Sequence, residues 1–169
     1  MNIISGIFKS IKIKTSKDLL YRPTKSLVRK SIFDSLNHLN FNSVCDLFSG
    51  SGIMGFESAS RGAKFVTFVD NDYRAIKLIK KNAMAMEGPH YSYFQKNVFS
   101  FLKNCNSFDL IYADPPYGKY DSIKLVEEVL KNLNNHGKLF LECDKKQEPF
   151  LESVVRDYGQ TRILQWENN

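Results

Sequence analysis

An acid followed by two prolines and a tyrosine, "DPPY" from Asp114 to Tyr117, ends the apolar run "FDLIYA". The prolines fix the backbone angles and contribute carbonyl groups without competing amides. The Asp114 carboxylate and the Pro115 carbonyl then form a pair of acceptors suited to the two hydrogens of an exocyclic amine. Held in this way, the conjugated nitrogen is aimed at an electrophile, and Tyr117 can stack on the ring that carries it. We interpret Asp114, Pro115, Pro116 and Tyr117 as a catalytic corner.

A second motif, "VCDLFSGSGIMGF", brings Asp46 to the end of an apolar run and continues into a glycine-rich turn. Gly50, Gly52 and Gly55 match the spacing of a dinucleotide site, and glycines let backbone amides approach a ligand closely. Asp46 argues against a nicotinamide dinucleotide, because an acid just before the loop would repel a pyrophosphate. S-adenosylmethionine has an ammonium, a sulfonium and no phosphate, so it suits this acid better. A dinucleotide oxidoreductase also leaves the Asp114 corner unexplained.

Further cofactor contacts are expected after the next two apolar runs. Asp70 can accept hydrogens from both ribose hydroxyls, since an ionised carboxylate only accepts hydrogen bonds, while Asp72 supplies the cap of the following helix. Asn97 can read the adenine edge with the help of the Val98 amide, although an Asn at this place also suits a helix cap. The expected cofactor contacts are Asp46, Phe48, Ser49, Gly50, Gly52, Asp70, Asn71, Asn97 and Val98.

Short apolar runs and helical segments alternate from residue 41 onward. Strands are predicted at 43–47, 64–69, 91–95, 108–113 and 138–143, and helices at 52–61, 72–86, 98–104 and 122–133. This alternation predicts an α/β fold with a mostly parallel, doubly wound sheet covered on both faces. Ligands of such sheets bind at the carboxyl ends of the strands. Two extended runs, 151–158 and 161–167, flank Gly159-Gln160 and predict a C-terminal antiparallel hairpin.

Residues 1–40 are predicted to form a basic extension in front of a core at 41–169, all within one domain. Loose alternation over 2–14 predicts a small β-hairpin, and 24–39 predicts a helix whose buried stripe includes Leu27 and Ile32. Between Lys9 and Lys30 the chain has eight basic residues and one acid. Such a run is often only a solvated face, but it also suits a polyanionic partner.

The composition excludes several classes of protein. The chain of 169 residues is 43% hydrophobic with a net charge of +6, which is typical of a globular protein. Its apolar runs are far shorter than the roughly 20 residues that span a bilayer, and the N-terminus lacks the core of a signal peptide. We therefore expect a cytoplasmic protein. Three scattered cysteines suggest reduced thiols, and three isolated histidines predict no metal site.

The motifs together resemble a known family. "DLFSGSG" followed by "DPPY" resembles the amino-group-modifying class of S-adenosylmethionine-dependent methyltransferases. The blocks "RPTKSLVRKSIFDSL", "DLFSGSGIMGFESASRGA" and "YGQTRILQW" resemble the RsmD family, the 16S rRNA (guanine-966-N2)-methyltransferases of bacteria. The resemblance covers nearly the whole chain. This chain differs from the family at Ser49, at Ile53-Met54 and at Asp70, where the family commonly has Ala, Ala-Leu and Glu.

The resemblance implies a class I (Rossmann-like) methyltransferase fold, S-adenosyl-L-methionine as cofactor and S-adenosyl-L-homocysteine as product. It also implies methylation of guanine N2 in the 16S rRNA of the small ribosomal subunit or its assembly intermediate. The basic N-terminus then contacts RNA, since phosphate contacts position the nucleic acid while the pocket reads the base. The RNA-binding residues expected on this basis are Lys9, Lys12, Arg22, Pro23, Thr24, Lys25 and Arg29.

Other functions remain open at this point. A DNA adenine-N6 methyltransferase uses a similar corner but usually needs a sizeable target-reading region, for which few residues are left. A protein glutamine methyltransferase typically begins the corner with Asn. A non-catalytic rRNA-binding assembly factor would be expected to have lost Asp114 or the glycine loop, and both are intact. We expect the protein to act as a monomer, without a metal or a membrane.

Overall fold

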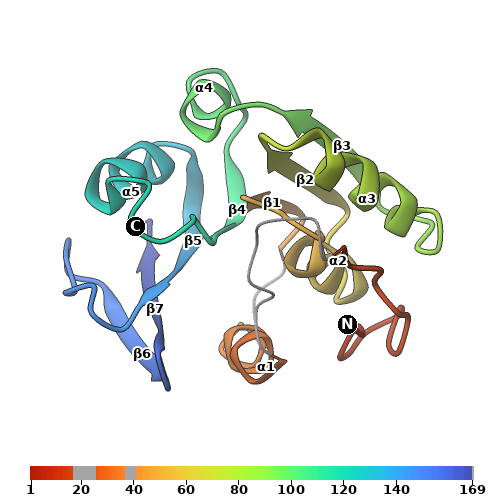
Figure 1. The fold of residues 1–169 in the computed structure, drawn as a ribbon, viewed down its shortest axis with the longest axis horizontal. Coiled ribbons are helices and arrows are strands. Elements are labelled where there is room, and N and C mark those ends of the chain that lie inside the picture. The colour runs from red at the N-terminus through yellow and green to blue at the C-terminus, as the bar shows by residue number, and fades with distance from the viewer. Residues whose placement is uncertain (17–25, 37–40, 169) are drawn as a thin grey trace.

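The structure is a computed structural model that describes residues 1–16, 26–36 and 41–168. A seven-stranded sheet with the order β3-β2-β1-β4-β5-β7-β6 forms its centre (Figure 1). The strands β1 to β5 pair in parallel, whereas β7 pairs antiparallel with both β5 and β6. The bounds are β1 (Ser43–Leu47), β2 (Phe65–Asp70), β3 (His90–Gln95), β4 (Phe108–Ala113), β5 (Leu133–Asp144), β6 (Val154–Tyr158) and β7 (Thr161–Glu167). The predicted fold class, with its doubly wound parallel sheet and C-terminal hairpin, is confirmed.

Five helices cover the two faces of this sheet in the described part of the chain. They are α1 (Ser26–Asp34), α2 (Ile53–Ser60), α3 (Tyr73–Ala83), α4 (Val98–Leu102) and α5 (Ser122–Leu130). The helices α1, α2 and α3 share one apolar cluster with the sheet and with Ile3 and Ile13 of the N-terminal segment. The helices α4 and α5 share a second cluster on the opposite face. The described helices include none long and apolar enough to span a membrane.

Several element boundaries differ from the predicted ones, most clearly between α5 and β5. The helix α5 ends at Leu130 and β5 already begins at Leu133, although a strand was predicted only from residue 138. The first part of β5 is irregular, with a register shift beside Phe108 and a positive φ at His136, which explains why no strand pattern is visible there. The predicted start of the first helix at Thr24 and its end at Leu39 lie outside the described residues.

The first helix also buries a different face from the predicted one. Val28, Ile32 and Leu36 are buried as predicted, but Leu27 is 65% exposed. Arg29, which was predicted to contact RNA, is only 3% exposed. Its Nη2 donates a hydrogen bond to the Asn2 carbonyl at 3.1 Å, so the buried side of α1 includes this guanidinium. The stripe is therefore rotated toward position 29, because the helix packs against the N-terminal segment.

The N-terminal segment, residues 1–16, docks onto α2 and α3. An antiparallel bridge joins Asn2 to Lys12, so the predicted hairpin forms, with one bridge in place of regular strands. The buried carboxylate of Glu57 accepts hydrogen bonds from the Ile4 and Ser5 amides at 2.8 and 3.2 Å. Asn82 accepts from the Lys14 amide at 2.9 Å and donates to its carbonyl at 3.0 Å. Core side chains thus hold the segment at both ends.

Gly6 makes the closest approach in this docking. Its φ is +85°, and a Cβ at this position would lie 1.8 Å from the Ser60 carbonyl oxygen. We expect Gly6→Ala to lower the free energy of unfolding by about 2 to 4 kcal/mol, because backbone strain and overpacking add together. Urea denaturation measures this loss, and limited proteolysis reports whether residues 1–16 have undocked.

Gly159→Ala is the matched control for Gly6→Ala. Gly159 also has a positive φ, +65°, but nothing lies within 4 Å of its Cβ position. The Gly159→Ala variant should lose only about 1 kcal/mol of unfolding free energy, from backbone strain at the positive φ. Its N-terminal segment should stay protected from protease. Equal losses of unfolding free energy in the two variants would show that the close approach to Ser60 does not contribute to stability.

Candidate active site at the carboxyl edge of the sheet

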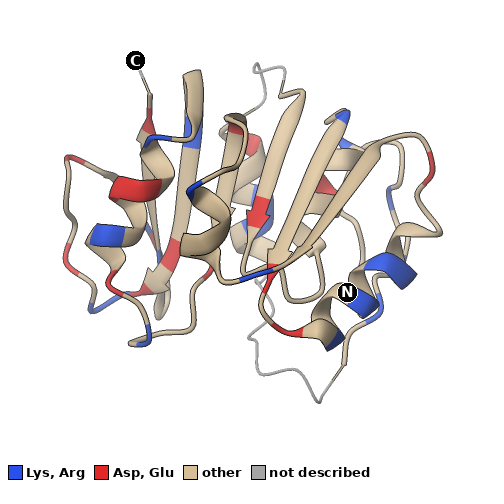
Figure 2. Ribbon diagram, turned by 90° about the horizontal axis from the view of Figure 1, so that it is seen from above, with Lys and Arg blue, Asp and Glu red and all other residues tan. Residues whose placement is uncertain are grey.

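The strands β1 and β4 are neighbours whose following helices pack on opposite faces of the sheet. Leu47 of β1 pairs with Ala113 of β4, so Phe48 and Asp114 each follow the last paired residue. The chain enters α2 on one face after β1 and α5 on the other after β4. This reversal makes the β1/β4 edge the switch point at which open α/β sheets bind ligands. Acidic residues lie at the arrowheads of several strands (Figure 2).

The glycine-rich turn after β1 has an unusual backbone. Phe48, Gly50 and Gly52 have positive φ angles of 59°, 53° and 79°, a region that disfavours residues with a Cβ. Ser49 fastens this turn to β2: its hydroxyl donates to the Asp46 carbonyl at 2.6 Å and accepts from the Val69 amide at 2.9 Å. The turn is therefore held rigidly between two strands, with its amides at the start of α2.

Asp46 lies beneath this turn and is 2% exposed. Its Oδ2 accepts a hydrogen bond at 3.0 Å from the amide of Gly55 in α2. Burial raises the pKa of Asp46 well above its ordinary value, the Gly55 amide opposes this, and the charge of Asp70 adds to it. A buried acid of this kind is suited to a cationic group that enters the same edge, because a neighbouring positive charge favours the ionised form.

Asp70 at the end of β2 joins the turn to the next helix. Its Oδ2 accepts from the Gly50 amide and its Oδ1 from the Asp72 amide, both at 2.9 Å. A carboxylate has about four acceptor positions, so it retains the capacity for ligand hydroxyls. Burial raises the pKa of Asp70. Asp72 caps α3 through the Arg74 amide at 2.8 Å, as the sequence predicted, and Asn71 between the two acids is exposed.

Asn97 is the cap of α4. Its Oδ1 accepts from the Phe99 amide at 2.9 Å and from the Ser100 amide at 3.4 Å. The cap role that the sequence also suggested is present. Because the oxygen already accepts two hydrogen bonds from the helix, the Nδ2 group is the part suited to a ligand, and the adenine contact stays a prediction. Val98, which follows it, is 2% exposed.

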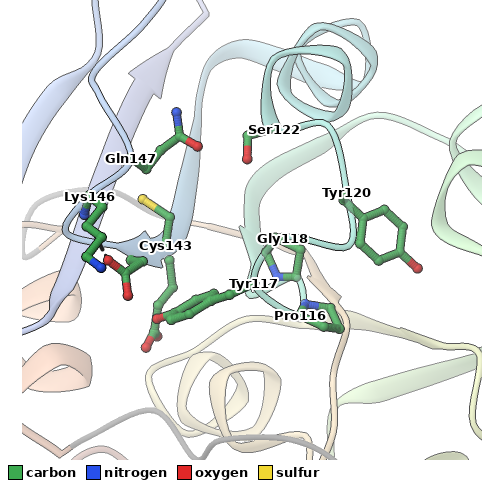
Figure 3. A pocket seen from close by; sticks show the side chains of 11 residues that line it. Pro116, Tyr117, Gly118, Tyr120, Ser122, Cys143, Lys146 and Gln147 are labelled. Atoms are coloured by element: carbon green, nitrogen blue, oxygen red, sulfur yellow. Dashed lines mark hydrogen bonds between the residues drawn. The ribbon is translucent and has the colours of Figure 1, made fainter.

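Pro115, Pro116 and Tyr117, which follow Asp114 directly, line a cavity of about 270 Å³ on the β5 side of the edge. Figure 3 shows Tyr117 and Pro116 on one wall and Cys143, Lys146 and Gln147 on the other, with Ser122 and Tyr120 beyond them. Pro115 is buried, whereas Tyr117 is 40% exposed. The cavity is just below the usual size of small-molecule pockets. It suits one planar base that enters from solvent beside Tyr117.

Aromatic rings connect the corner to the cofactor turn. The rings of Phe48 and Tyr120 meet edge to face with their centroids 4.9 Å apart. Tyr120 also contacts Phe99 of α4 at 6.2 Å. These three rings lie between the β1 turn and the loop after β4, so the two halves of the site share an apolar wall.

Several residues at this edge were not singled out from the sequence. Tyr120 lies in the loop after the corner, and Glu142, Asp144, Lys146 and Gln147 come from the end of β5 and the segment behind it. The signal was present in the string "LECDKKQ", because polar residues at the end of a parallel strand share the edge of the other strand ends. The sequence alone does not reveal that β5 is the neighbour of β4.

The cysteines behave as buried thiols. Cys45 and Cys143 are buried and Cys105 is half-buried, with all three free, as predicted. Burial raises the pKa of Cys143 to about 12, although this residue lines the cavity. A protonated thiol is a poor nucleophile, so the chemistry of the site rests on its oxygen acceptors. Among residues 1–16, 26–36 and 41–168, no group of three or more His, Cys, Asp or Glu is placed to hold a metal.

The expected RNA-binding residues fall into three groups. Lys9 and Lys12 are exposed on the docked N-terminal segment. The sites at Arg22, Pro23, Thr24 and Lys25 lie outside the described residues. Arg29 faces inward, and its buried Nε and Nη1 atoms have no hydrogen-bond partner among the residues that the structure describes. Burial also lowers its pKa, so its predicted role as a phosphate contact is corrected to a structural one.

Known proteins resemble this chain over nearly its whole length. Residues 1–166 match the family described as Conserved hypothetical protein 95. A protein of Buchnera aphidicola subsp. Acyrthosiphon pisum named Ribosomal RNA small subunit methyltransferase D is 31% identical over 151 residues, which are 86% of this chain and 78% of that protein. The chain belongs to the RsmD family.

Two further relatives extend this finding. The Ribosomal RNA small subunit methyltransferase D of Escherichia coli K12 is 28% identical over 139 residues, which are 81% of this chain and 68% of that protein. A solved structure from Thermus thermophilus matches with a TM-score of 0.87 at 25% identity and covers 98% of each chain. This RsmD-family chain is a class I methyltransferase whose cofactor is S-adenosylmethionine. The buried carboxylate of Asp46, the half-buried carboxylate of Asp70 and the glycine turn fit an ammonium group and ribose hydroxyls.

Proposed function

We propose that this RsmD-family protein methylates the exocyclic N2 amine of a guanine in 16S rRNA of the small ribosomal subunit, at the position known as 966. The cavity between the Asp114 corner and the end of β5 carries this proposal, because it lies beside the cofactor turn and is open to solvent at Tyr117. The names of the relatives given above support ribosomal RNA as the substrate.

The cofactor would be held by the residues along the β1, β2 and β3 ends. Asp46 would face the ammonium group, Asp70 the ribose hydroxyls, and Asn97 with Val98 the adenine. The remaining proposed cofactor contacts are Phe48, Ser49, Gly50, Gly52 and Asn71. When bound, S-adenosylmethionine supplies an activated methyl group.

Asp114 and the Pro115 carbonyl would accept the two N2 hydrogens of the guanine. This would direct the nitrogen lone pair at the methyl group that the cofactor supplies. The N2 proton then leaves to Asp114 or to water. Positioning supplies most of the rate enhancement in such a step, since the protein forms no covalent bond to the substrate. Tyr117 would stack on the base, which must be unpaired or flipped to enter.

Methyl transfer to defined nucleic acids tests this proposal. The protein is incubated with labelled S-adenosylmethionine and, separately, with 30S subunits, with naked 16S rRNA that lacks the modification, and with unmethylated DNA. We expect labelled N2-methylguanosine in one of the ribosomal substrates after nuclease digestion and mass spectrometry. Label in adenine of DNA would favour a DNA adenine-N6 methyltransferase. No transfer to any rRNA would favour a non-catalytic assembly factor.

The basic N-terminal segment would position the rRNA through its phosphates. Lys9 and Lys12 are exposed, so Lys9→Ala with Lys12→Ala should weaken rRNA binding and lower the salt dependence of the binding constant by about one unit of slope per lysine. Fluorescence anisotropy at several salt concentrations measures this slope.

Lys131→Ala is the control for the removal of a lysine elsewhere on the surface. Lys131 is the C-cap of α5, where it pairs with Glu128 at 2.7 Å, away from the N-terminal segment. This variant should keep the wild-type slope, and both variants should keep cofactor affinity. An unchanged slope in the double variant would exclude the two lysines from RNA contact.

A further inference from the structure

Glu142 is a buried acid inside the substrate cavity to which no role has yet been given. It lies in β5, is 3% exposed and lines the cavity together with Pro115, Pro116 and Tyr117. Burying a carboxylate costs free energy unless it is hydrogen-bonded, and a buried acid beside a ligand cavity is a candidate for recognition.

The register of the sheet brings Glu142 next to Asp114. Tyr112 pairs with Phe140 and Ala113 with Leu141, so Asp114 and Glu142 are the next positions along β4 and β5. Side chains alternate between the faces of a sheet, so a residue two positions beyond Phe140 projects on the same face as Tyr112. The hydrogen bond from the Tyr112 hydroxyl to Glu142 Oε2 agrees with this.

Tyr112 keeps the carboxylate in one orientation. Its ring is buried beneath the site, and its hydroxyl donates to one oxygen of Glu142. An ionised carboxylate has about four acceptor positions and no donor, so it can accept further hydrogens from a ligand. Glu142 therefore offers an acceptor to the cavity from β5, next to the strand end that Asp114 follows.

The guanine base carries hydrogens in the matching arrangement. Its N2 amine and its N1–H are adjacent donors on one edge, whereas adenine has a bare acceptor at N1. We propose that Glu142 selects guanine by accepting the N1–H hydrogen while Asp114 holds N2. This inference rests on the proposed guanine-N2 activity. Lys146 and Gln147 on the same wall provide donors of the kind that the guanine O6 requires.

A base analogue separates this role from a structural one. 2,6-Diaminopurine keeps the 2-amino group but has a bare nitrogen at N1, which would face the carboxylate lone pairs. Ligated 16S rRNA with guanine or 2,6-diaminopurine at the target is assayed for methylation at the 2-amino group. We expect the wild type to prefer guanine at least tenfold in kcat/KM, about the effect of one charged hydrogen bond.

Glu142→Gln should reduce this preference about tenfold or reverse it, because the amide of glutamine can donate to a bare N1. Glu142→Asp retains a carboxylate and should keep the preference at a lower rate. Asp144→Asn is the matched control, since Asp144 lines the cavity and accepts from the Lys146 amide at 2.9 Å.

The outcomes distinguish this inference from the function on which it rests. If the wild type methylates both bases equally well, or if Glu142→Gln keeps the wild-type preference, the role of Glu142 is overturned while guanine-N2 methylation stands. If the wild type methylates no 2-amino group in rRNA, the proposed function and this inference fall together. The wild-type comparison can overturn the role of Glu142 even where a variant fails to fold. Because the analogue also carries an amino group in place of O6, the change in preference in Glu142→Gln is the result that assigns the effect to Glu142.

Discussion

Replacement of Asp114 by alanine is expected to lower methyl transfer about 10²- to 10⁴-fold, the usual range for a positioned proton acceptor. The reason is that the amine would lose one of the two acceptors that orient its lone pair. Asp114 follows the last residue of β4, so its removal should leave the sheet and the cofactor turn intact. Steady-state kinetics with rRNA measures the loss, and calorimetry should find unchanged cofactor affinity.

Lys119→Ala is the control within the same turn. Lys119 is exposed, and its contribution to the turn is a backbone hydrogen bond to the Pro116 carbonyl at 3.1 Å, which alanine retains. The turnover of the Lys119→Ala variant should equal that of the wild type. Undiminished turnover in Asp114→Ala would remove this carboxylate from the mechanism.

Asp46→Asn is expected to weaken binding of S-adenosylmethionine about 10- to 100-fold. A hydrogen bond to a charged group contributes about 1.5 to 3 kcal/mol, and every 1.4 kcal/mol changes affinity about tenfold. The asparagine oxygen can still accept from the Gly55 amide, so the variant removes the charge and keeps the bond at 3.0 Å that supports α2. Calorimetry measures the affinity, and circular dichroism checks the fold. Wild-type affinity in this variant would contradict the ammonium contact.

The same residue makes cofactor binding depend on pH. In the free protein burial raises the pKa of Asp46, so its carboxyl holds a proton at pH values where an ordinary aspartate is ionised. A bound cation favours the ionised form, so binding releases a proton and affinity rises with pH up to the raised pKa. Calorimetry in buffers of different ionisation heat detects this proton, which Asp46→Asn should abolish. Identical heats in all buffers for the wild type would exclude the linkage.

Much of the site was visible in the sequence because its parts are local. The strands at 43–47, 108–113 and 161–167 agree with the prediction to the residue, since apolar runs ended by turn residues leave few other choices. Asp72 before α3 follows from cap chemistry in the same way. Parallel strands also bring their carboxyl ends to one edge. Asp46, Asp70 and Asp114 were therefore expected to lie together before the order of the strands was known.

Residues whose surroundings come from distant segments were misjudged. Arg29 belongs to a basic run and was expected to face solvent, but the N-terminal segment covers it and accepts its hydrogen bond. Leu27 was expected inside the helix stripe and is exposed. A helical pattern gives the spacing of a buried face, whereas its rotation depends on what packs against the helix.

The sequence by itself determined the chemistry that this protein brings to its site: acids at strand ends, a glycine turn and a rigid corner of acceptors. These depend on residue type and on neighbours along the chain. Only the tertiary structure decided which groups share the cavity, because that depends on strand order. The pairing of β4 with β5 brings Glu142 next to the strand end that Asp114 follows. No sequence pattern between residues 114 and 142 indicates that they are neighbours. The proposed selection of guanine by Glu142 depends on this order of the strands.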